Sequence, residues 1–562
     1  MGREGHVVVD LHPALVLLVG AVLVAIAPRR LGGPIAVASA LVGLLAVVRL
    51  DDAALSTFDF YGYQLTVLRA DGLSIPFATV FAVVAVLAGI YGWSTMGTLE
   101  RAGALATAGA GIGVVLAGDL LTLFFFWELK VSTATMVIVG ARRAGSSAAG
   151  LRYLGVHLLG GVVLLGGILW HLTDTGSLAF GSLELGGATG LILVGFLLCA
   201  AAVPLNAWLP DAYPEASVAG MVFLSAFTTK SAVYVLARGF AGLELLVWLG
   251  VAMALFGVVY AVLEDDIRRL LGYHIISQVG FMVAAVGVGT DLAVNGATAH
   301  AYAHVLYKGL LIMGVGVVLH ATGRSRASEL GGLARALPWA LALYLVGALS
   351  ISGVPLFSGF PAKELAVASV GDGGFTTAQW LLKLASVGTF LSVALKLPWA
   401  TWFGAPRGPL EVRAVPVTMY LAMGIAAVAN IAIGVDPGLL YGQMPTEVAF
   451  EPYTTTKLVE ALQLFAFTGI GFTLLRSRLA PAAKTSVDTD WVYRELPVLV
   501  AARRAEQPAR PTATTERRRL PRPTLPRPTL PGPGLGPVAP GWLLGSVVAM
   551  AMVLVLGWSV VP

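Results

Sequence analysis

The sequence has very few cysteines and very few charged residues. Its single cysteine, Cys199, stands inside an apolar run, which excludes an internal disulfide, an iron–sulfur cluster held by cysteines and a four-cysteine zinc site. The sequence also lacks a phosphate-binding loop and a glycine-rich dinucleotide fingerprint, so it indicates neither ATP nor nicotinamide chemistry. We therefore expect no cofactor and no metal, and we expect the energy for any transport to come from a gradient or a partner.

Charged residues make up only 12% of the 562 residues, whereas 57% are hydrophobic. This balance excludes a water-soluble globule. About sixteen apolar runs approach the ~20 residues needed to cross a bilayer, so we predict an all-α polytopic membrane protein. The expected cores are 13–28, 33–49, 73–94, 103–118, 120–140, 152–172, 188–206, 217–238, 244–263, 270–289, 297–320, 338–360, 379–401, 416–434, 457–476 and 541–560.

Basic residues gather in alternate connections between these runs. They include Arg29, Arg30, Arg101, Arg142, Arg143, Arg268, Arg269, Arg324, Arg326, Arg407 and Arg413. The positive-inside rule predicts that these connections are cytoplasmic in a cell membrane, and this orientation explains the net charge of +5 without a nucleic-acid partner. The connection 51–72 alternates apolar and polar residues and predicts an exposed outer hairpin.

Residues 477–540 change character because they are rich in proline and arginine. Proline opposes a helix and arginine opposes a packed core, so we predict an extended cytoplasmic linker to the last span, at 541–562. Attachment of this linker to anionic lipid is the alternative.

Most lysines of this chain lie in or against the apolar runs. They are Lys130, Lys230, Lys308, Lys363, Lys383 and Lys396. A lysine near the bilayer centre costs about 2.5–3.5 kcal/mol on insertion scales. Proton handling explains such a cost, because a desolvated ammonium loses its proton far more easily than a guanidinium does. For Lys383 and Lys396, which lie near span ends, snorkelling to the interface is the alternative.

Glu128 lies in the apolar run LLTLFFFWELKVSTATMVIVG and needs a cation to stay ionised. Lys130 is two residues further on and therefore points away from it on a helix. We expect a partner on another span, with Lys230 as the first candidate. A purely structural buried ion pair is the alternative.

His300, His304 and Lys308 recur at i, i+4 and i+8, which places them along one helical face. This spacing predicts a stripe of exchangeable protons. A metal site and a polar seam between helices are the alternatives.

Two apolar runs contain prolines and small residues that predict broken helices. One is LSISGVPLFSGFPAKEL, just before Lys363, and the other is WLPDAYPEAS, which carries Asp211 and Glu215. Broken helices in transporters line ion paths, because their freed carbonyl groups face a wet cavity.

Six strings, in order, carry a family resemblance across about residues 70–435. They are DLLTLFFFWEL, AVPLNAWLPDAYPEA, FLSAFTTKSAVYVLAR, DIRRLLGYHIISQVGF, HAYAHVLYKGLL and GALSISGVPLFSGFPAKEL. They resemble the antiporter-like subunits shared by Mrp-type multisubunit sodium/proton antiporters and respiratory complex I. The string DTDWVYREL also resembles the D-type subunits of Mrp antiporters. The resemblance implies two inverted five-helix repeats with broken helices, spans 4–8 and 9–13, each forming a proton half-channel.

The resemblance also implies roles for individual residues. Glu128 and Lys230 match the family's span-five glutamate and span-eight lysine. His300, His304 and Lys308 match the span-eleven relay, and Lys363 matches the exit residue. Cys199 stands where the family usually has a lysine partner for the glutamate, and Asn206 stands where a histidine is common. Lys130 is a candidate replacement, although its helical direction opposes this, and Asp211 and Lys396 are accessory candidates.

These expectations divide the chain into six parts. They are 1–100 with the first spans and hairpin, 101–240 and 241–403 as the two half-channel repeats, 404–476 with further spans, the linker 477–540 and the final helix 541–562. The function that the intramembrane charges and the resemblance favour is proton translocation in a multisubunit complex with other subunits, most simply in exchange for Na⁺. A membrane-arm subunit of a complex I-like or hydrogenase-like redox complex, a subunit of an inorganic-carbon uptake complex and a structural scaffold are the alternatives.

Overall fold

The computed structural model describes residues 12–408, 411–480 and 488. The chain divides into two compact units, Met1–Ser486 and Val487–Pro562, and every element below belongs to the first. The linker expected at 477–540 lies almost wholly outside the described residues, and the final span expected at 541–562 lies entirely outside them.

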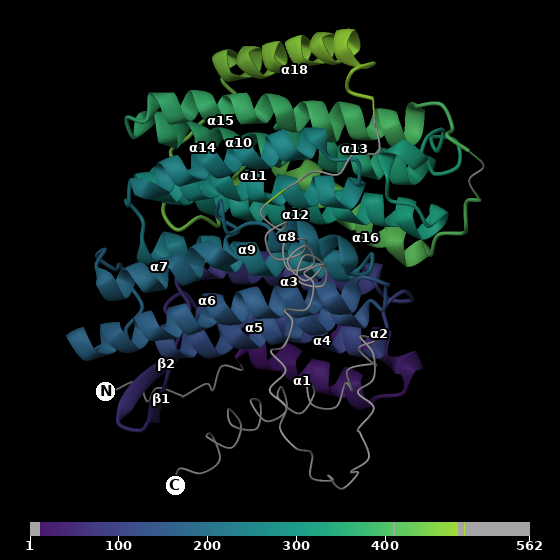
Figure 1. Cartoon of the computed structure of the whole chain (residues 1–562). Helices are drawn as coiled ribbons and strands as arrows, with labels where there is room; N and C mark the ends of the chain where they lie inside the picture. The colour runs from purple at the N-terminus through teal and green to yellow at the C-terminus, as the bar shows by residue number, and fades with distance from the viewer. Residues whose placement is uncertain (1–11, 409–410, 481–487, 489–562) are drawn as a thin grey trace, which may run out of the picture. The chain divides into compact units, whose positions relative to one another are not determined.

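The first unit is built almost entirely of helices, most of which run side by side (Figure 1). The helices are α1 (Pro13–Ile26), α2 (Arg29–Val48), α3 (Ser74–Tyr91), α4 (Thr98–Leu116), α5 (Leu120–Gly140), α6 (Ser146–Thr175), α7 (Gly187–Cys199), α8 (Trp208–Ala212), α9 (Gly220–Gly239), α10 (Leu245–Leu263), α11 (Ile267–Val288), α12 (Asp291–Thr322), α13 (Pro338–Ser352), α14 (Gly359–Asp372), α15 (Thr376–Thr389), α16 (Val417–Val435), α17 (Gly438–Tyr441) and α18 (Thr455–Leu475). Short helical turns complete them: η1 (Tyr213–Glu215), η2 (Ala327–Glu329), and the π-helical η3 (Phe390–Lys396) and η4 (Trp399–Phe403), which prolong α15.

The apolar runs of the sequence predict these helices well. Within the described residues, twelve helices are long and apolar enough to cross a membrane, and three shorter apolar helices accompany them. Each of the first fifteen expected spans falls on one of these fifteen helices. The predicted spans 188–206 and 338–360 are too long, because α7 ends at Cys199 and α13 ends at Ser352.

Both shortened helices are broken where the sequence predicts a break. Between α13 and α14 the polar groups of Ser358 have partners on α16: Asn430 accepts a hydrogen bond from the Ser358 hydroxyl (2.6 Å) and another from the Ser358 backbone N–H (2.8 Å). Gly359 is required at the start of α14, because a Cβ atom there would clash with the Ser350 carbonyl group. Between α7 and α8 the indole of Trp208 donates to the Leu198 carbonyl (3.0 Å). Polar groups at both breaks therefore have hydrogen-bond partners inside the bundle.

The second helix of each predicted repeat begins with the same local arrangement. Asp119 caps α5 by accepting from the Thr122 N–H (2.7 Å), and it forms a β-bridge with Ala179, after α6. Asp266 caps α11 by accepting from the Arg268 N–H (2.8 Å), and it forms a β-bridge with Arg326, after α12. Five spans separate the two caps, so they lie at opposite ends of the bundle.

The two ends of the bundle differ in their connections. The end that carries the arginines of the alternate connections, from Arg29 to Arg413, is called the arginine side here. The other end carries the predicted hairpin and is called the hairpin side. Strand β1 (Leu55–Phe60) pairs antiparallel with β2 (Tyr63–Arg69), and the turn residues Tyr61 and Gly62 both have positive φ, as a two-residue hairpin turn requires.

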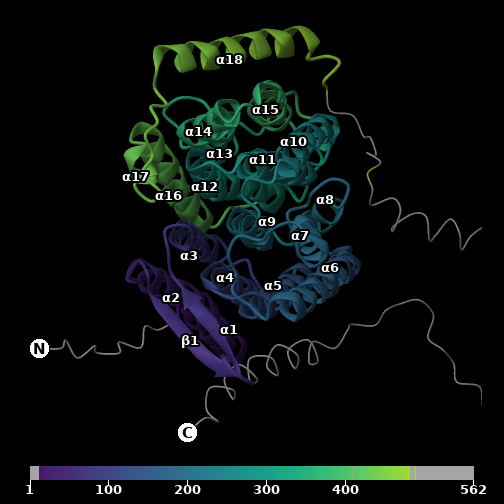
Figure 2. The same cartoon turned by 90° about the vertical axis from the view of Figure 1, so that its left-hand side faces the viewer.

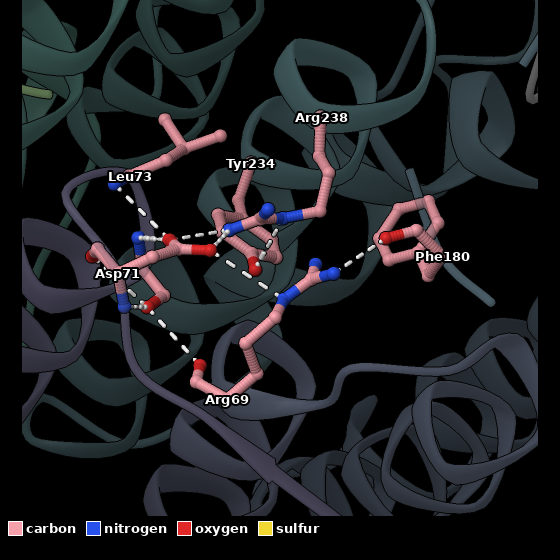
Figure 3. A network of polar contacts seen from close by, with 7 residues as sticks. Arg69, Asp71, Leu73, Phe180, Tyr234 and Arg238 are labelled. Carbon is pink, nitrogen blue, oxygen red and sulfur yellow. Dashed lines mark hydrogen bonds and ion pairs between the residues drawn. The ribbon is translucent and has the colours of Figure 1, made fainter. Parts of the chain in front are cut away.

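A cluster of arginines and one aspartate ties the hairpin to the helices (Figure 3). Asp71 follows β2 and accepts hydrogen bonds from the Arg238 guanidinium at the end of α9 (2.6 and 2.8 Å). Arg69 lies 3.4 Å from the Asp71 carboxylate and donates to the Phe180 carbonyl (2.8 Å). Arg238 also donates to the Tyr234 hydroxyl (2.8 Å). The cluster therefore joins the hairpin, α9 and the segment after α6.

Helix α18 differs from the others in direction and burial. Figure 2 views most helices end-on but shows α18 lengthwise across the edge formed by α15. Only 11% of the residues in its most apolar 18-residue stretch are buried. It meets the bundle through an ion pair between Lys383 and Glu460 (2.8 Å) and through ring contacts of Phe390 with Phe465.

Candidate functional site

The titratable side chains predicted from the sequence lie in two groups inside the bundle. The first group, called the α5 cluster here, consists of Glu128, Lys130 and Cys199, together with His157, which was not predicted from the sequence. The second, called the central row, consists of Lys230, His300, His304, Lys308 and Lys363. Both groups are placed by helices whose remaining side chains are mostly apolar.

In the α5 cluster, Glu128 and Lys130 point in different directions, as their spacing predicts. Glu128 is half-buried and its carboxylate lies against Gly161 of α6, where an added Cβ atom would meet the Glu128 Oε1. Lys130 is fully buried and turns toward α7, with its Nζ 4.0 Å from the Cys199 sulfur and 3.8 Å from the centroid of the Trp127 ring. Lys130 therefore lies beside the position that the family resemblance assigns to a lysine.

The expected direct pair between Glu128 and Lys230 is not formed. Among the described residues no ion pair joins them, because the Lys230 ammonium is held by its own helix. Its Nζ donates to the Ser225 carbonyl (2.7 Å) and to the Thr229 hydroxyl (3.1 Å). The charged side chain that acts electrostatically on Glu128 is Lys130.

In the central row, the predicted stripe on α12 is present and completely buried. The rings of His300 and His304 have centroids 6.4 Å apart, and the Tyr307 hydroxyl lies 3.4 Å from His300 Nε2. Within the described part of the chain, both ring nitrogens of His304 and the Lys308 Nζ have no hydrogen-bond partner. Buried polar groups of this kind are rare in a purely structural seam, because each one is costly to leave unsatisfied.

The broken helix brings Lys363 to the same place. Its Nζ donates to the Ile351 carbonyl (2.8 Å), at the end of α13, and lies 5.1 Å from the centroid of the Phe281 ring. Phe281 in turn lies beside His300, with ring centroids 5.8 Å apart. Lys363 interacts electrostatically with both His300 and His304.

Lys230 joins this row from α9. It interacts electrostatically with His300, His304 and Lys308. The structure therefore brings together five residues that are spread over 134 positions of the sequence, from Lys230 to Lys363, whereas it leaves Glu128 in a separate cluster.

The accessory candidates have structural partners. Asp211 lies in α8 and is held by Arg152, whose guanidinium forms two hydrogen bonds with the carboxylate (2.7 and 2.8 Å). Lys396 lies in η3 and donates to the carbonyl groups of Val262 (2.6 Å) and Glu264 (3.1 Å), at the end of α10. Lys396 is 5% exposed, so snorkelling does not describe it.

Two buried histidines that lie beside the lysines of these groups were not predicted from the sequence. His274 of α11 shares a short hydrogen bond with the Ser392 hydroxyl (2.7 Å), and Lys308 and Lys363 act on it electrostatically. His157 of α6 is 2% exposed and lies near Lys130. A histidine inside an apolar run, as in LGYHIISQVGF, was the available signal. The described residues contain no group of three or more histidine, cysteine or acidic side chains placed to hold a metal.

These features define a class. A helical membrane bundle with two broken helices and a buried row of lysines and histidines is typical of membrane proteins that transport ions or protons. Residues 117–392 match the family described as NADH:quinone oxidoreductase/Mrp antiporter, transmembrane. This match covers just under half of the 562 residues, and over that part the chain is similar to the family.

Individual curated proteins are also similar to this chain. The chain is 32% identical over 274 residues to the D-type subunit of the Na(+)/H(+) antiporter of Alkalihalophilus pseudofirmus. The aligned region covers 45% of this chain and 55% of the relative. The chain spans about half the length of the curated relatives it matches. The activity of this chain as a whole is therefore a proposal.

Two solved structures share the fold. One is the Mrp complex from Dietzia sp. DQ12-45-1b, with a TM-score of 0.69 and 23% identity, covering 83% of this chain and 98% of that chain. The other is a membrane-bound sulfane sulfur reductase, an archaeal respiratory membrane complex, with a TM-score of 0.71 and 25% identity, covering 85% of this chain and 86% of that chain.

Proposed function

We propose that this chain is a proton-translocating subunit of a multisubunit membrane complex and that it exchanges protons for Na⁺. The observation that carries the proposal is the central row. Five titratable side chains from α9, α12 and α14 meet in a buried region, and three of them are lysines. Burial and mutual repulsion oppose full protonation of such a row, so its members exchange protons readily.

The order of residues along the row supports a path through the bundle. The broken end of α13 faces Lys363, and Lys230 stands on the side of the α5 cluster. We propose that 101–240 and 241–403 form the two half-channels and that protons pass between them along this row. Steps longer than a hydrogen bond require bridging water, which polar surfaces of this kind hold.

The name of the Alkalihalophilus relative supports Na⁺ as the exchanged cation. The likeness to the sulfane sulfur reductase supports a second candidate, in which the chain belongs to a membrane arm and electron transfer in partner subunits drives the protons. For both candidates we propose a cell membrane location, with the arginine side and the linker 477–540 in the cytoplasm.

Proton flux in vesicles that contain the whole purified complex tests the proposal. An imposed Na⁺ gradient should drive dye-reported proton movement, and Lys230→Met should reduce it at least about tenfold without changing complex assembly. Lys383→Met is the matched control, because this lysine forms an exposed ion pair with Glu460. Normal flux in the assembled Lys230→Met complex would refute the proposal. Flux that requires a reductant instead of Na⁺ would select the second candidate.

A further inference from the structure

His157 is a buried titratable side chain that the central row does not include. It lies on α6, four residues before Gly161, and is 2% exposed. Its Nδ1 lies 3.0 Å from the Tyr153 carbonyl oxygen. A carbonyl only accepts, so Nδ1 carries the hydrogen and Nε2 presents a lone pair. Among the described residues, Nε2 has no hydrogen-bond partner.

The position of His157 on α6 links the arginine side with Glu128. Residues four apart on a helix are neighbours on one face, about 6 Å apart. Gly161, which touches the Glu128 carboxylate, is therefore the next turn from His157 toward the hairpin side. In the other direction Arg152 and its partner Asp211 lie on the turn nearer the arginine side, where Arg152 is 30% exposed.

Packing alone does not require a histidine here. The His157 ring stacks on Tyr153, with centroids 4.1 Å apart, and meets Trp208 edge-on at 4.4 Å. An apolar aromatic ring makes the same contacts, and it avoids leaving a buried nitrogen without a partner, which costs about 1–3 kcal/mol. The unpartnered nitrogen therefore indicates a role other than packing.

We propose that His157 relays protons between the arginine side and Glu128. The inference rests on the proposed function and adds a residue to its first half-channel. A proton arriving from water adds to the Nε2 lone pair, which converts the imidazole to imidazolium. The same proton then passes from Nε2 through bridging water to the Glu128 carboxylate, which becomes a carboxylic acid, and the imidazole is neutral again.

Lys130 gives this step a direction. It acts electrostatically on His157 and on Glu128. A positive charge there repels the imidazolium and so favours release of the proton to the carboxylate. The bond from Nδ1 to the Tyr153 carbonyl keeps the ring oriented throughout, because only Nε2 gains and loses the proton.

A pair of isosteric variants separates relay from packing. His157→Gln removes the titratable group, whereas His157→Glu has the same shape and can carry a proton. Flux per assembled complex should fall at least about tenfold in His157→Gln, and it should be several-fold higher in His157→Glu than in His157→Gln. His171→Gln, near the other end of the same helix, is the control and should keep normal flux.

Each outcome decides the inference. Normal flux in His157→Gln, or equal flux in the Gln and Glu variants, would overturn it, and failure of both to assemble would make His157 a packing residue. Lys230→Met distinguishes this failure from failure of the proposed function. Lost flux in Lys230→Met with normal flux in His157→Gln overturns the relay alone, whereas normal flux in Lys230→Met overturns the proposed function.

Discussion

The ammonium of Lys130 lies 4.0 Å from the sulfur of Cys199, and the same sulfur lies 3.7 Å from the Thr228 carbonyl oxygen. Helices α5, α7 and α9 thus meet around one buried thiol. Lys130 reaches this point although it is only two residues from Glu128, because the two side chains leave α5 on different faces. The ammonium of a lysine on α5 therefore lies next to the position on α7 where the family resemblance expects a lysine.

This contact predicts strong coupling between positions 130 and 199. Cys199→Lys should place a second ammonium beside the first, and we expect less assembled complex and less proton flux. Lys130→Met in the same protein should restore both, with a coupling energy on the order of 1–3 kcal/mol. The measurement is flux and assembly for the two single variants and the double variant. Additive effects would contradict a shared site.

The contact between Gly161 and Glu128 predicts a second effect. Gly161→Ala places a Cβ atom against the Glu128 Oε1, so the flexible carboxylate must shift while the backbone stays in place. We expect flux to fall about tenfold, since small displacements of a reacting group are costly. Gly166→Ala is the control, because no heavy atom lies within 4 Å of its Cβ position. In a Glu128→Gln protein, already slow, Gly161→Ala should add nothing.

The central row predicts unequal effects along α12. His304→Ala and Lys308→Ala should each slow proton flux at least about tenfold, because both are buried in the row. His320, half-buried at the arginine-side end of the same helix, should tolerate replacement by alanine with normal flux. Flux in vesicles and thermal stability of the complex are measured together. Equal losses of stability in all three variants would favour a structural seam.

Asp71 predicts a pH dependence of stability. Burial raises the pKa of the Asp71 carboxyl, but hydrogen bonds and charge from Arg238, with smaller contributions from Ser74 and Arg69, outweigh it and hold the pKa below its usual value. Its stabilising contribution is therefore complete above the unfolded pKa of about 3.9 and is lost as the pH falls through the lower folded pKa.

We expect Asp71→Asn to lower the free energy of unfolding of the solubilised complex by about 1 kcal/mol at pH 7, a value reduced for the partial exposure of the group. The difference from the wild type should shrink as the pH falls from ~4 through the lower folded pKa, at which the wild-type carboxyl also loses its charge. Thermal unfolding at several pH values measures this, and Asp59→Asn, in the exposed part of β1, is the control. A difference that persists unchanged in acid would contradict the assignment.

The helices were predictable from the sequence because a membrane span is recognisable as a long run of apolar residues. Even the two breaks were visible as proline and glycine inside apolar runs. The partner of Lys230 was not predictable, since a carbonyl of its own helix, that of Ser225, competes with any carboxylate nearby and leaves no trace in the sequence. The proximity of Lys130 to Cys199 was likewise hidden, because it depends on how α5 and α7 are rotated relative to each other.

The matched caps Asp119 and Asp266 show how helix starts are completed at the two ends of the bundle. Each aspartate caps the second helix of its predicted repeat and forms a β-bridge with a segment that follows the next helix, yet the two caps lie at opposite ends of the bundle. Each of these two helix starts is therefore stabilised by contacts within the chain, whichever end of the bundle it lies at. One local arrangement therefore serves at both ends of the bundle, which face opposite sides of the membrane.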